Sequence, residues 1–192
     1  MRLFTALWPS GAAIRHLASD VDAIALDRLA EATEGLHKFR FIPPARWHLT
    51  LCFHGDDADP DELGDRLERR VARLGLEQAP STRLASAGTF RGVLWIGTED
   101  ADHSAMCALV RAAGGDPHDY RGHLTVARWA RGRPRGALLP GLFDGYAGPW
   151  WSAAEVCLVS SDQGEGGPVY RTVRSVPVTR AAPGQPGSNP PP

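Results

Sequence analysis

One four-residue pattern occurs twice in the chain, as HLTL at residues 48–51 and as HLTV at residues 123–126. An unperturbed imidazole titrates near neutrality, so one histidine can accept a proton while the other donates one. Threonine hydroxyls can donate hydrogen bonds to the non-bridging oxygens of a phosphate. His48 and His123, with Thr50 and Thr125, therefore predict acid–base catalysis at a phosphoryl group, by a reaction that needs no metal.

Both copies lie in apolar runs that end at turn-forming residues, which is typical of β-strands. Side chains alternate along a strand, so His48 and Thr50 share one face while the aliphatic residues between them face the core. The same alternation pairs His123 with Thr125. In-line attack at phosphorus needs an acid and a base on opposite sides of the phosphoryl group. We therefore expect the two strands to face each other across a groove.

Other interpretations of the pattern remain open. A single histidine on a strand is more often structural than catalytic, and the duplication is what favours a site. A module that binds RNA ends without turning them over would carry the same residues. A zinc protein is the weakest alternative, because no third ligand has a convincing spacing and no Cys-x-x-Cys is present. We expect neither a metal nor a cofactor.

Arginines and aromatic residues surround the second copy. Arginine suits bidentate contact with phosphate, although a cluster in a loop can also be a solvated surface. Trp129 shares the parity of His123, which makes it a candidate for stacking on a base, whereas Trp47 has core parity. Phe4 and Tyr120 are further stacking candidates, and His54 has the parity of His48. The clustered arginines are Arg121, Arg128, Arg131, Arg133 and Arg135.

Composition places the chain among ordinary globular proteins. Its 192 residues are 43 % hydrophobic with a formal net charge of −1, which does not suggest a strong nucleic-acid binder. No apolar run is long enough to span a bilayer, and the first segment does not suit a signal peptide. We expect a cytoplasmic, monomeric protein that does not bind membranes.

The order of elements predicts an α+β fold. We expect two lobes related by a pseudo-two-fold axis, each an antiparallel sheet with outer helices, interleaved in one domain over residues 1–180. Residues 181–192, rich in proline and glycine, are expected to be a disordered tail. Strands are predicted at residues 2–8, 39–42, 46–54, 82–90, 93–98, 122–130, 152–160 and 169–178, and helices at 11–30, 60–74 and 101–113.

The chain resembles the 2H phosphoesterase superfamily, and within it the RNA 2′,3′-cyclic phosphodiesterases of the 2′-5′ RNA ligase family. The two HLT segments are copies of its HxTx motif. Four longer stretches resemble its first strand, its two motif blocks and its closing hairpin. They are RLFTAL at 2–7, RWHLTLCFHGD at 46–56, YRGHLTVAR at 120–128 and EVCLVSSDQGEGGPVYRTV at 155–173. The resemblance covers nearly all of residues 1–178.

This resemblance implies hydrolysis of a terminal RNA 2′,3′-cyclic phosphate to a 2′-phosphomonoester. It makes His48 the proton donor to the leaving ribose oxygen and His123 the acceptor that activates water; the residues alone do not decide between these roles. Thr50 and Thr125 would hold the phosphate, with Arg128 beside it. Strict alternation places Arg128 on the face opposite His123, so it reaches the groove only if a bulge or the strand end turns it.

Related substrates also fit the resemblance. They are a small cyclic nucleotide, an ADP-ribose cyclic phosphate, or a 2′-5′ linkage, including reversible 2′-5′ ligation. Pocket width and the placement of aromatic rings would decide among them. In each case the partners are RNA ends or small nucleotides.

Overall fold

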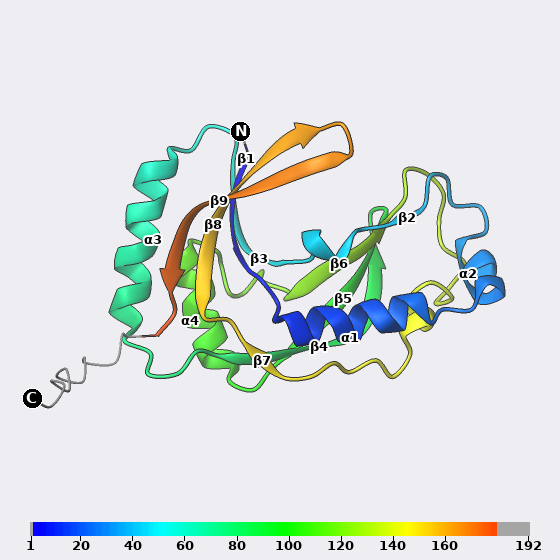
Figure 1. Cartoon of the computed structure of the whole chain (residues 1–192), viewed down its shortest axis with the longest axis horizontal. Coiled ribbons are helices and arrows are strands. Elements are labelled where there is room, and N and C mark those ends of the chain that lie inside the picture. Colours follow the sequence, from blue (N-terminus) through cyan, green and yellow to red (C-terminus); the bar gives the residue numbers. More distant parts are fainter. Residues whose placement is uncertain (1, 180–192) are drawn as a thin grey trace, which may run out of the picture.

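The computed structural model describes residues 2–179, which form two antiparallel sheets (Figure 1). The first has the strand order β3-β1-β8-β9 and the second the order β2-β6-β5-β4-β7. This confirms the predicted α+β class. The strands of the first sheet are β1 (Arg2–Leu7), β3 (Leu49–Gly55), β8 (Glu155–Gly164) and β9 (Gly167–Pro177). Those of the second are β2 (Arg40–Phe41), β4 (Ser81–Phe90), β5 (Val93–Asp100), β6 (His123–Arg128) and β7 (Trp151–Ser152). The expected disordered tail lies outside the described residues.

The two sheets are interleaved along the chain. Strand β1 pairs with both β3 and β8, so the first and last parts of the chain share a sheet. The short strand β2 crosses to the second sheet, where it pairs with β6. Each motif strand therefore belongs to a different sheet, β3 to the first and β6 to the second.

The helices are exchanged between the lobes in the same way. Helices α3 (Pro60–Leu74) and α4 (His103–Ala113) contact each other, and α4 also contacts β3, so both cover the first sheet. Helix α1 (Gly11–Asp22) runs along the second sheet, and α2 (Leu26–Thr33) lies at its far end (Figure 1). The first lobe thus takes α4 from the second half of the sequence, and the second lobe takes α1 and α2 from the first half.

Several predicted boundaries differ from the structure, among them that of the strand expected over residues 152–160, which begins at Glu155 and runs to Gly164, and two others have a local cause. The helix expected over residues 11–30 ends at Asp22, and a second helix begins at Leu26. The apolar stripe fails at position 28, which holds an arginine, so a continuous helix would bury no apolar residue there. The first motif strand begins only at Leu49, because Pro44 starts a 3₁₀ turn over Pro44–Arg46.

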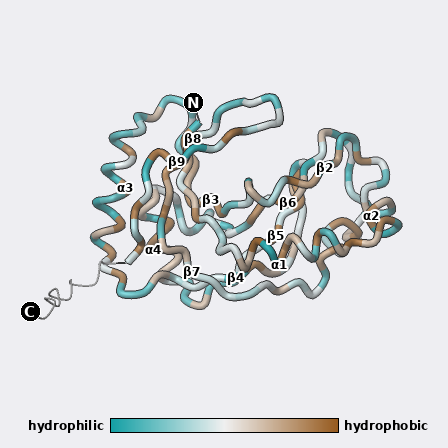
Figure 2. Tube along the Cα trace, viewed as in Figure 1, coloured by the Kyte–Doolittle hydropathy of each residue, from teal (hydrophilic) through white to brown (hydrophobic). Residues whose placement is uncertain are grey.

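The alternation predicted for the motif strands is observed on their core side. Leu49, Leu124 and Val126 are fully buried, and Leu51 is nearly so. They join one hydrophobic cluster with residues of α1, α3, α4 and both sheets. Hydrophobic stretches lie along α4 and β8, while α3 is mostly hydrophilic (Figure 2). Burial of this kind stabilises the two sheets against each other.

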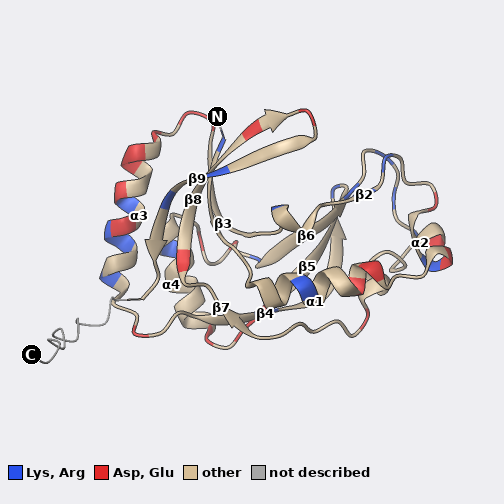
Figure 3. Cartoon of the chain, in the orientation of Figure 1, with Lys and Arg blue, Asp and Glu red and all other residues tan. Residues whose placement is uncertain are grey.

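Charged residues gather on the outside of the fold. Acidic and basic side chains alternate along α3 (Figure 3). The Arg174 guanidinium of β9 lies 3.3 Å from Asp65 and 3.1 Å from Glu68 of that helix. These half-exposed pairs orient the helix but contribute little to stability. In residues 2–179, no helix combines the length and the apolar character needed to cross a membrane.

We expect Leu124→Ala to lower the free energy of unfolding by about 2–5 kcal/mol, because it leaves a cavity on the core face of β6. Urea denaturation would measure the change. Leu26→Ala is the matched control, since Leu26 is 83 % exposed, and it should change stability by less than about 0.5 kcal/mol. Equal losses in the two variants would contradict the assigned core face.

Candidate active site

The four motif side chains line one groove between the sheets. It has a volume of about 500 Å³ and contains His48 and Thr50 from the first lobe, with His123, Thr125 and Arg128 from the second. The structure thus brings together all five residues that the sequence predicts for proton transfer and phosphate contact. Facing sheets supply the two-sided arrangement that in-line attack requires.

A β-bulge follows the threonine of each motif strand. In the first sheet Ala6 is paired with Thr50 but Thr5 with Cys52, which leaves Leu51 as an extra residue on β3. In the second sheet Trp95 is paired with Thr125 but Leu94 with Ala127, which leaves Val126 as an extra residue on β6. Each bulge inverts the alternation of the side chains that follow it, on β3 as far as a second bulge at His54.

On β6 the bulge turns Arg128 into the groove. This is the irregularity that the sequence required for Arg128 to reach the same side as His123. It turns Trp129 the other way. Trp129 is only 9 % exposed, and its indole Nε1 donates a hydrogen bond to the Gly132 carbonyl at 3.2 Å. The prediction that Trp129 stacks on a base is therefore wrong, because it extended simple alternation past a bulge.

The bulge on β3 has the equivalent effect. Phe53 lines the groove and is 61 % exposed, at the same offset from His48 as Arg128 from His123. His54 faces away from the groove, with its Nε2 2.8 Å from the Thr5 hydroxyl. The alternation that placed His54 beside His48 fails for the same reason as that for Trp129. Sequence reasoning missed Phe53, which only the register reveals.

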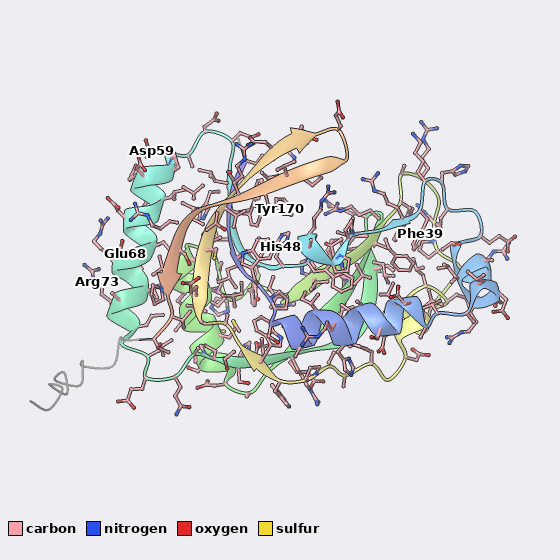
Figure 4. All side chains as sticks on the ribbon, in the orientation of Figure 1. Phe39, His48, Asp59, Glu68, Arg73 and Tyr170 are labelled. Carbon is pink, nitrogen blue, oxygen red and sulfur yellow. The ribbon has the colours of Figure 1, made fainter. Side chains whose placement is uncertain are left out.

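An aromatic cage holds the His48 ring. Its centroid lies 4.9 Å from Phe4, 5.5 Å from Trp8 and 5.1 Å from Tyr170. His48 and Tyr170 lie together between the sheets (Figure 4). Phe4 lines the groove but is only 4 % exposed, so its main contact is with the imidazole, and its stacking on a base stays a prediction. Tyr170 was not predicted, although it lies in the stretch that resembles the family's closing hairpin.

Each of the two imidazoles is fixed by an equivalent hydrogen bond. His48 Nδ1 lies 2.8 Å from the carbonyl of Arg46, and His123 Nδ1 lies 2.7 Å from the carbonyl of Arg121. In each case the carbonyl belongs to the residue two positions earlier. A carbonyl only accepts, so each Nδ1 carries the proton and each Nε2 is left for chemistry. The pseudo-two-fold symmetry therefore extends to the tautomers.

Burial lowers the pKa of His48, and the hydrogen bond to Arg46 opposes this shift only in part. The nearby positive charges of His123 and Arg128 lower the pKa further. These influences show that the three side chains share one electrostatic environment. In the free protein they favour neutral His48, and a phosphate anion in the groove would favour the protonated form.

Further arginines line the groove from positions that the sequence did not single out. They are Arg2, Arg40 and Arg46. Arg46 also donates to the carbonyl of Gly166 at 3.0 Å, which ties the β8–β9 hairpin to the groove. Of the predicted cluster, Arg131, Arg133 and Arg135 lie outside the groove, and the Arg135 guanidinium pairs with Glu34 at 2.6 Å. Arg2 on β1 and Arg40 on β2 come from strands distant from the second motif, and Arg46 from the turn before His48, so pairing of the strands decides that these three meet in the groove.

Tyr120, the last predicted stacking residue, does not line the groove. It belongs to a second pocket behind His123, and its buried hydroxyl has no partner among the described residues. Within residues 2–179, no group of three or more histidine, cysteine or acidic side chains is arranged to hold a metal ion.

Residues 15–165 match the family model of the 2′-5′ RNA ligase superfamily. The chain belongs to this superfamily. The resemblance to 2H phosphoesterases is thus confirmed, and with it a general activity on phosphodiesters of RNA or nucleotides, by hydrolysis or ligation.

Solved structures share the fold of this superfamily member. TT0787 of Thermus thermophilus is 24 % identical, with a TM-score of 0.64 over 93 % of this chain and 98 % of that one. LigT of E. coli complexed with ATP is 22 % identical, with a TM-score of 0.60 and the same coverage. LigT complexed with NADP+ is 18 % identical, with a TM-score of 0.63 and again the same coverage. No curated protein matches the sequence.

Arg128→Gln should raise the pKa of His48, because it removes a positive charge that disfavours the imidazolium. NMR titration of the His48 imidazole would measure the pKa. Added phosphate should also raise it, since an anion favours the charged form. Arg135→Gln, outside the groove, is the control and should leave it unchanged. An unchanged pKa in Arg128→Gln would show that Arg128 does not share the groove with His48.

Proposed function

We propose that this superfamily member hydrolyses RNA 2′,3′-cyclic phosphate ends to 2′-phosphomonoesters without a metal ion. His48 acts as the proton donor and His123 as the proton acceptor. The observation that carries the proposal is the placement of two His-Thr pairs in one groove, each on a different sheet, with Arg128 turned in beside them.

In the proposed reaction the phosphate lies between the two histidines. His123 Nε2 takes a proton from water, whose oxygen attacks phosphorus. The bond from phosphorus to O3′ breaks, and O3′ takes the proton of His48. Thr50 and Thr125 donate hydrogen bonds to the non-bridging oxygens, and Arg128 stabilises the charge that develops on them.

The lowered pKa of His48 limits the donor role to the complex. In the free protein, burial and the charges of His123 and Arg128 favour neutral His48. A bound phosphodiester carries a negative charge into the same environment and favours the imidazolium. Substrate binding therefore supplies the protonated acid that the reaction needs.

The groove also suits a nucleotide. Exposed Phe53 offers a face on which a base can stack beside the phosphate site. Among the similar structures, E. coli LigT is complexed with phosphate and with 3′-AMP. A single chain supplies every residue of the proposed site, which supports activity as a monomer. We expect it to act in the cytoplasm.

A short RNA ending in a 2′,3′-cyclic phosphate, incubated with the protein in excess EDTA, should be converted to the 2′-phosphate. Enzymatic discrimination of 2′- and 3′-phosphate ends would identify the product. A 3′-phosphate would reverse the assigned leaving oxygen. Loss of activity in EDTA would contradict the metal-independent mechanism, and binding without conversion would favour a module that only recognises RNA ends.

His48→Ala and His123→Ala should each lower kcat by about 10²–10⁴-fold, since each removes one proton-transfer group. Steady-state kinetics on the cyclic phosphate would measure the loss, and circular dichroism would verify the fold. The control is His37→Ala, because His37 is exposed and outside the groove. Near wild-type turnover in either motif variant would rule out the acid–base pair.

A further inference from the structure

A second pocket of about 500 Å³ opens beside the groove, and His123 lines both. It lies on the groove-facing side of the second sheet, because Trp95 and Thr125 are cross-strand neighbours and share that face. Hydrolysis of a terminal cyclic phosphate uses none of its other walls. We name it the Trp95 pocket, after its main residues Phe90, Trp95, Asp100, Tyr120, Arg121 and His123.

The Trp95 pocket contains an aromatic surface built on glycines. A side chain at Gly88 would come within 2.2 Å of the Trp95 indole, and one at Gly97 within 3.3 Å of it. Glycine at both positions lets the indole lie directly on the strands. The Phe90 ring is 45 % exposed, and its centroid lies 6.4 Å from Trp95 and 5.3 Å from His123. Such rings favour a flat aromatic ligand.

Unpaired polar groups stand beside this aromatic surface. The side chain of Asp100 is only 10 % exposed. Its Oδ2 lies 3.7 Å from Nδ1 of His103, which also lines the pocket, and its Oδ1 has no hydrogen-bond partner among the described residues. The buried hydroxyl of Tyr120 is unpaired in the same way. Burial, reinforced by the negative charge of Asp100, raises the pKa of Tyr120 and keeps it a hydroxyl. Leaving such groups unpaired is costly, so a ligand with matching donors would be stabilised.

A carboxylate accepts hydrogen bonds and cannot donate them. Guanine presents two adjacent donors on one edge, its ring N1–H and its 2-amino group. Adenine and cytosine present an amino group next to a ring nitrogen acceptor, which a carboxylate would repel. Arg121 also lines the pocket; its Nη1 donates to the carbonyls of His118 and Tyr120, and its other guanidinium N–H groups are left to donate to the guanine carbonyl. The polar groups of the pocket therefore match guanine better than the other bases.

We propose that the Trp95 pocket binds a guanine nucleoside whose 5′-oxygen lies at His123. This rests on the proposed function, in which His123 serves the oxygen that attacks phosphorus. A nucleoside 5′-hydroxyl in the place of water would form a 2′-5′ phosphodiester. Its oxygen bonds to phosphorus and its proton goes to His123, while O3′ leaves with the proton of His48.

Cleavage of a 2′-5′ phosphodiester is the reverse of this reaction. The 3′-hydroxyl of a 2′-5′-linked dinucleotide attacks phosphorus and loses its proton to His48. The bond to the 5′-oxygen breaks, and guanosine leaves with the proton of His123. No water or other reactant is consumed, and the second product is a 2′,3′-cyclic phosphate. The pocket thus selects the nucleoside joined through its 5′-oxygen.

The test compares cleavage of three 2′-5′-linked dinucleotides that differ only in the 5′-linked base. The dinucleotide with guanine should be cleaved about tenfold or more faster than the one with hypoxanthine. Hypoxanthine lacks only the 2-amino group, so one hydrogen bond to the charged carboxylate is lost. Adenine should also be slower. Each rate is divided by the rate at which the same variant hydrolyses adenosine 2′,3′-cyclic phosphate, so that general damage to the site cancels.

Asp100→Asn should reduce the preference for guanine over hypoxanthine to near one. Glu99→Gln is the matched control, because it removes a carboxylate from the neighbouring position of β5, where Glu99 pairs with Arg83 outside the pocket. It should keep the wild-type preference. Equal rates with guanine and hypoxanthine in the wild type would overturn the proposal, as would a preference that survives Asp100→Asn.

A binding measurement separates this proposal from the proposed function. Free guanosine should shift the indole N–H resonance of Trp95, assigned by its loss in Trp95→Phe, at concentrations about tenfold lower than inosine requires. If the protein binds guanosine but hydrolyses no cyclic phosphate, the guanine pocket is supported and the proposed hydrolysis is contradicted. If the protein hydrolyses the cyclic phosphate but guanosine causes no shift, the proposed hydrolysis is supported and the guanine pocket is contradicted.

Discussion

One bulge directly after the threonine of each motif strand decides which side chains reach the groove. The bulges at Leu51 and Val126 invert the alternation beyond the threonines, so Phe53 and Arg128 turn toward the groove while Trp129 turns away. Without the bulge on β6, the Arg128 guanidinium would point into the apolar core, where an unpaired charge is very costly. The bulges thus keep the leucines and the valine in the core while adding a cation to the groove. Both occur at the same offset from their histidine, so the pseudo-two-fold symmetry includes the irregularities as well as the motifs.

The two halves of the groove differ chemically in spite of this symmetry. His48 is enclosed by three aromatic rings, and burial lowers its pKa. His123 stands between the groove and the Trp95 pocket. At the offset where the second lobe places a cation, the first places an exposed phenylalanine, Phe53. A symmetric scaffold with unequal surroundings suits a reaction whose two sides need different groups, an acid on one side and a base on the other.

Interleaving of the lobes holds this geometry together. Strands from both ends of the chain meet in the first sheet, and β2 joins the second. The lobes also exchange helices, so neither sheet has a complete cover without residues from the other half of the sequence. The hydrophobic cluster runs through both sheets, and a displacement of one motif strand against the other would disturb that shared packing. Such a core keeps two histidines in register across a groove.

The sequence by itself determined the class of the fold, the two motif strands and the five residues that meet in the groove. These follow from local information, namely apolar periodicity, turn residues and a repeated spacing. Alternation alone placed Arg128 on the face opposite His123, so the sequence also indicated that Arg128 needs a bulge or a strand end to reach the groove. Only the tertiary structure decided whether this requirement was met, and it placed Trp129 and Tyr120 outside the groove in which they were expected to stack on a base. A bulge is defined by the partner strand, and an aromatic cage or a second pocket by strands distant in sequence. Pairing register and long-range packing are properties of several strands together, so no single stretch of sequence contains them.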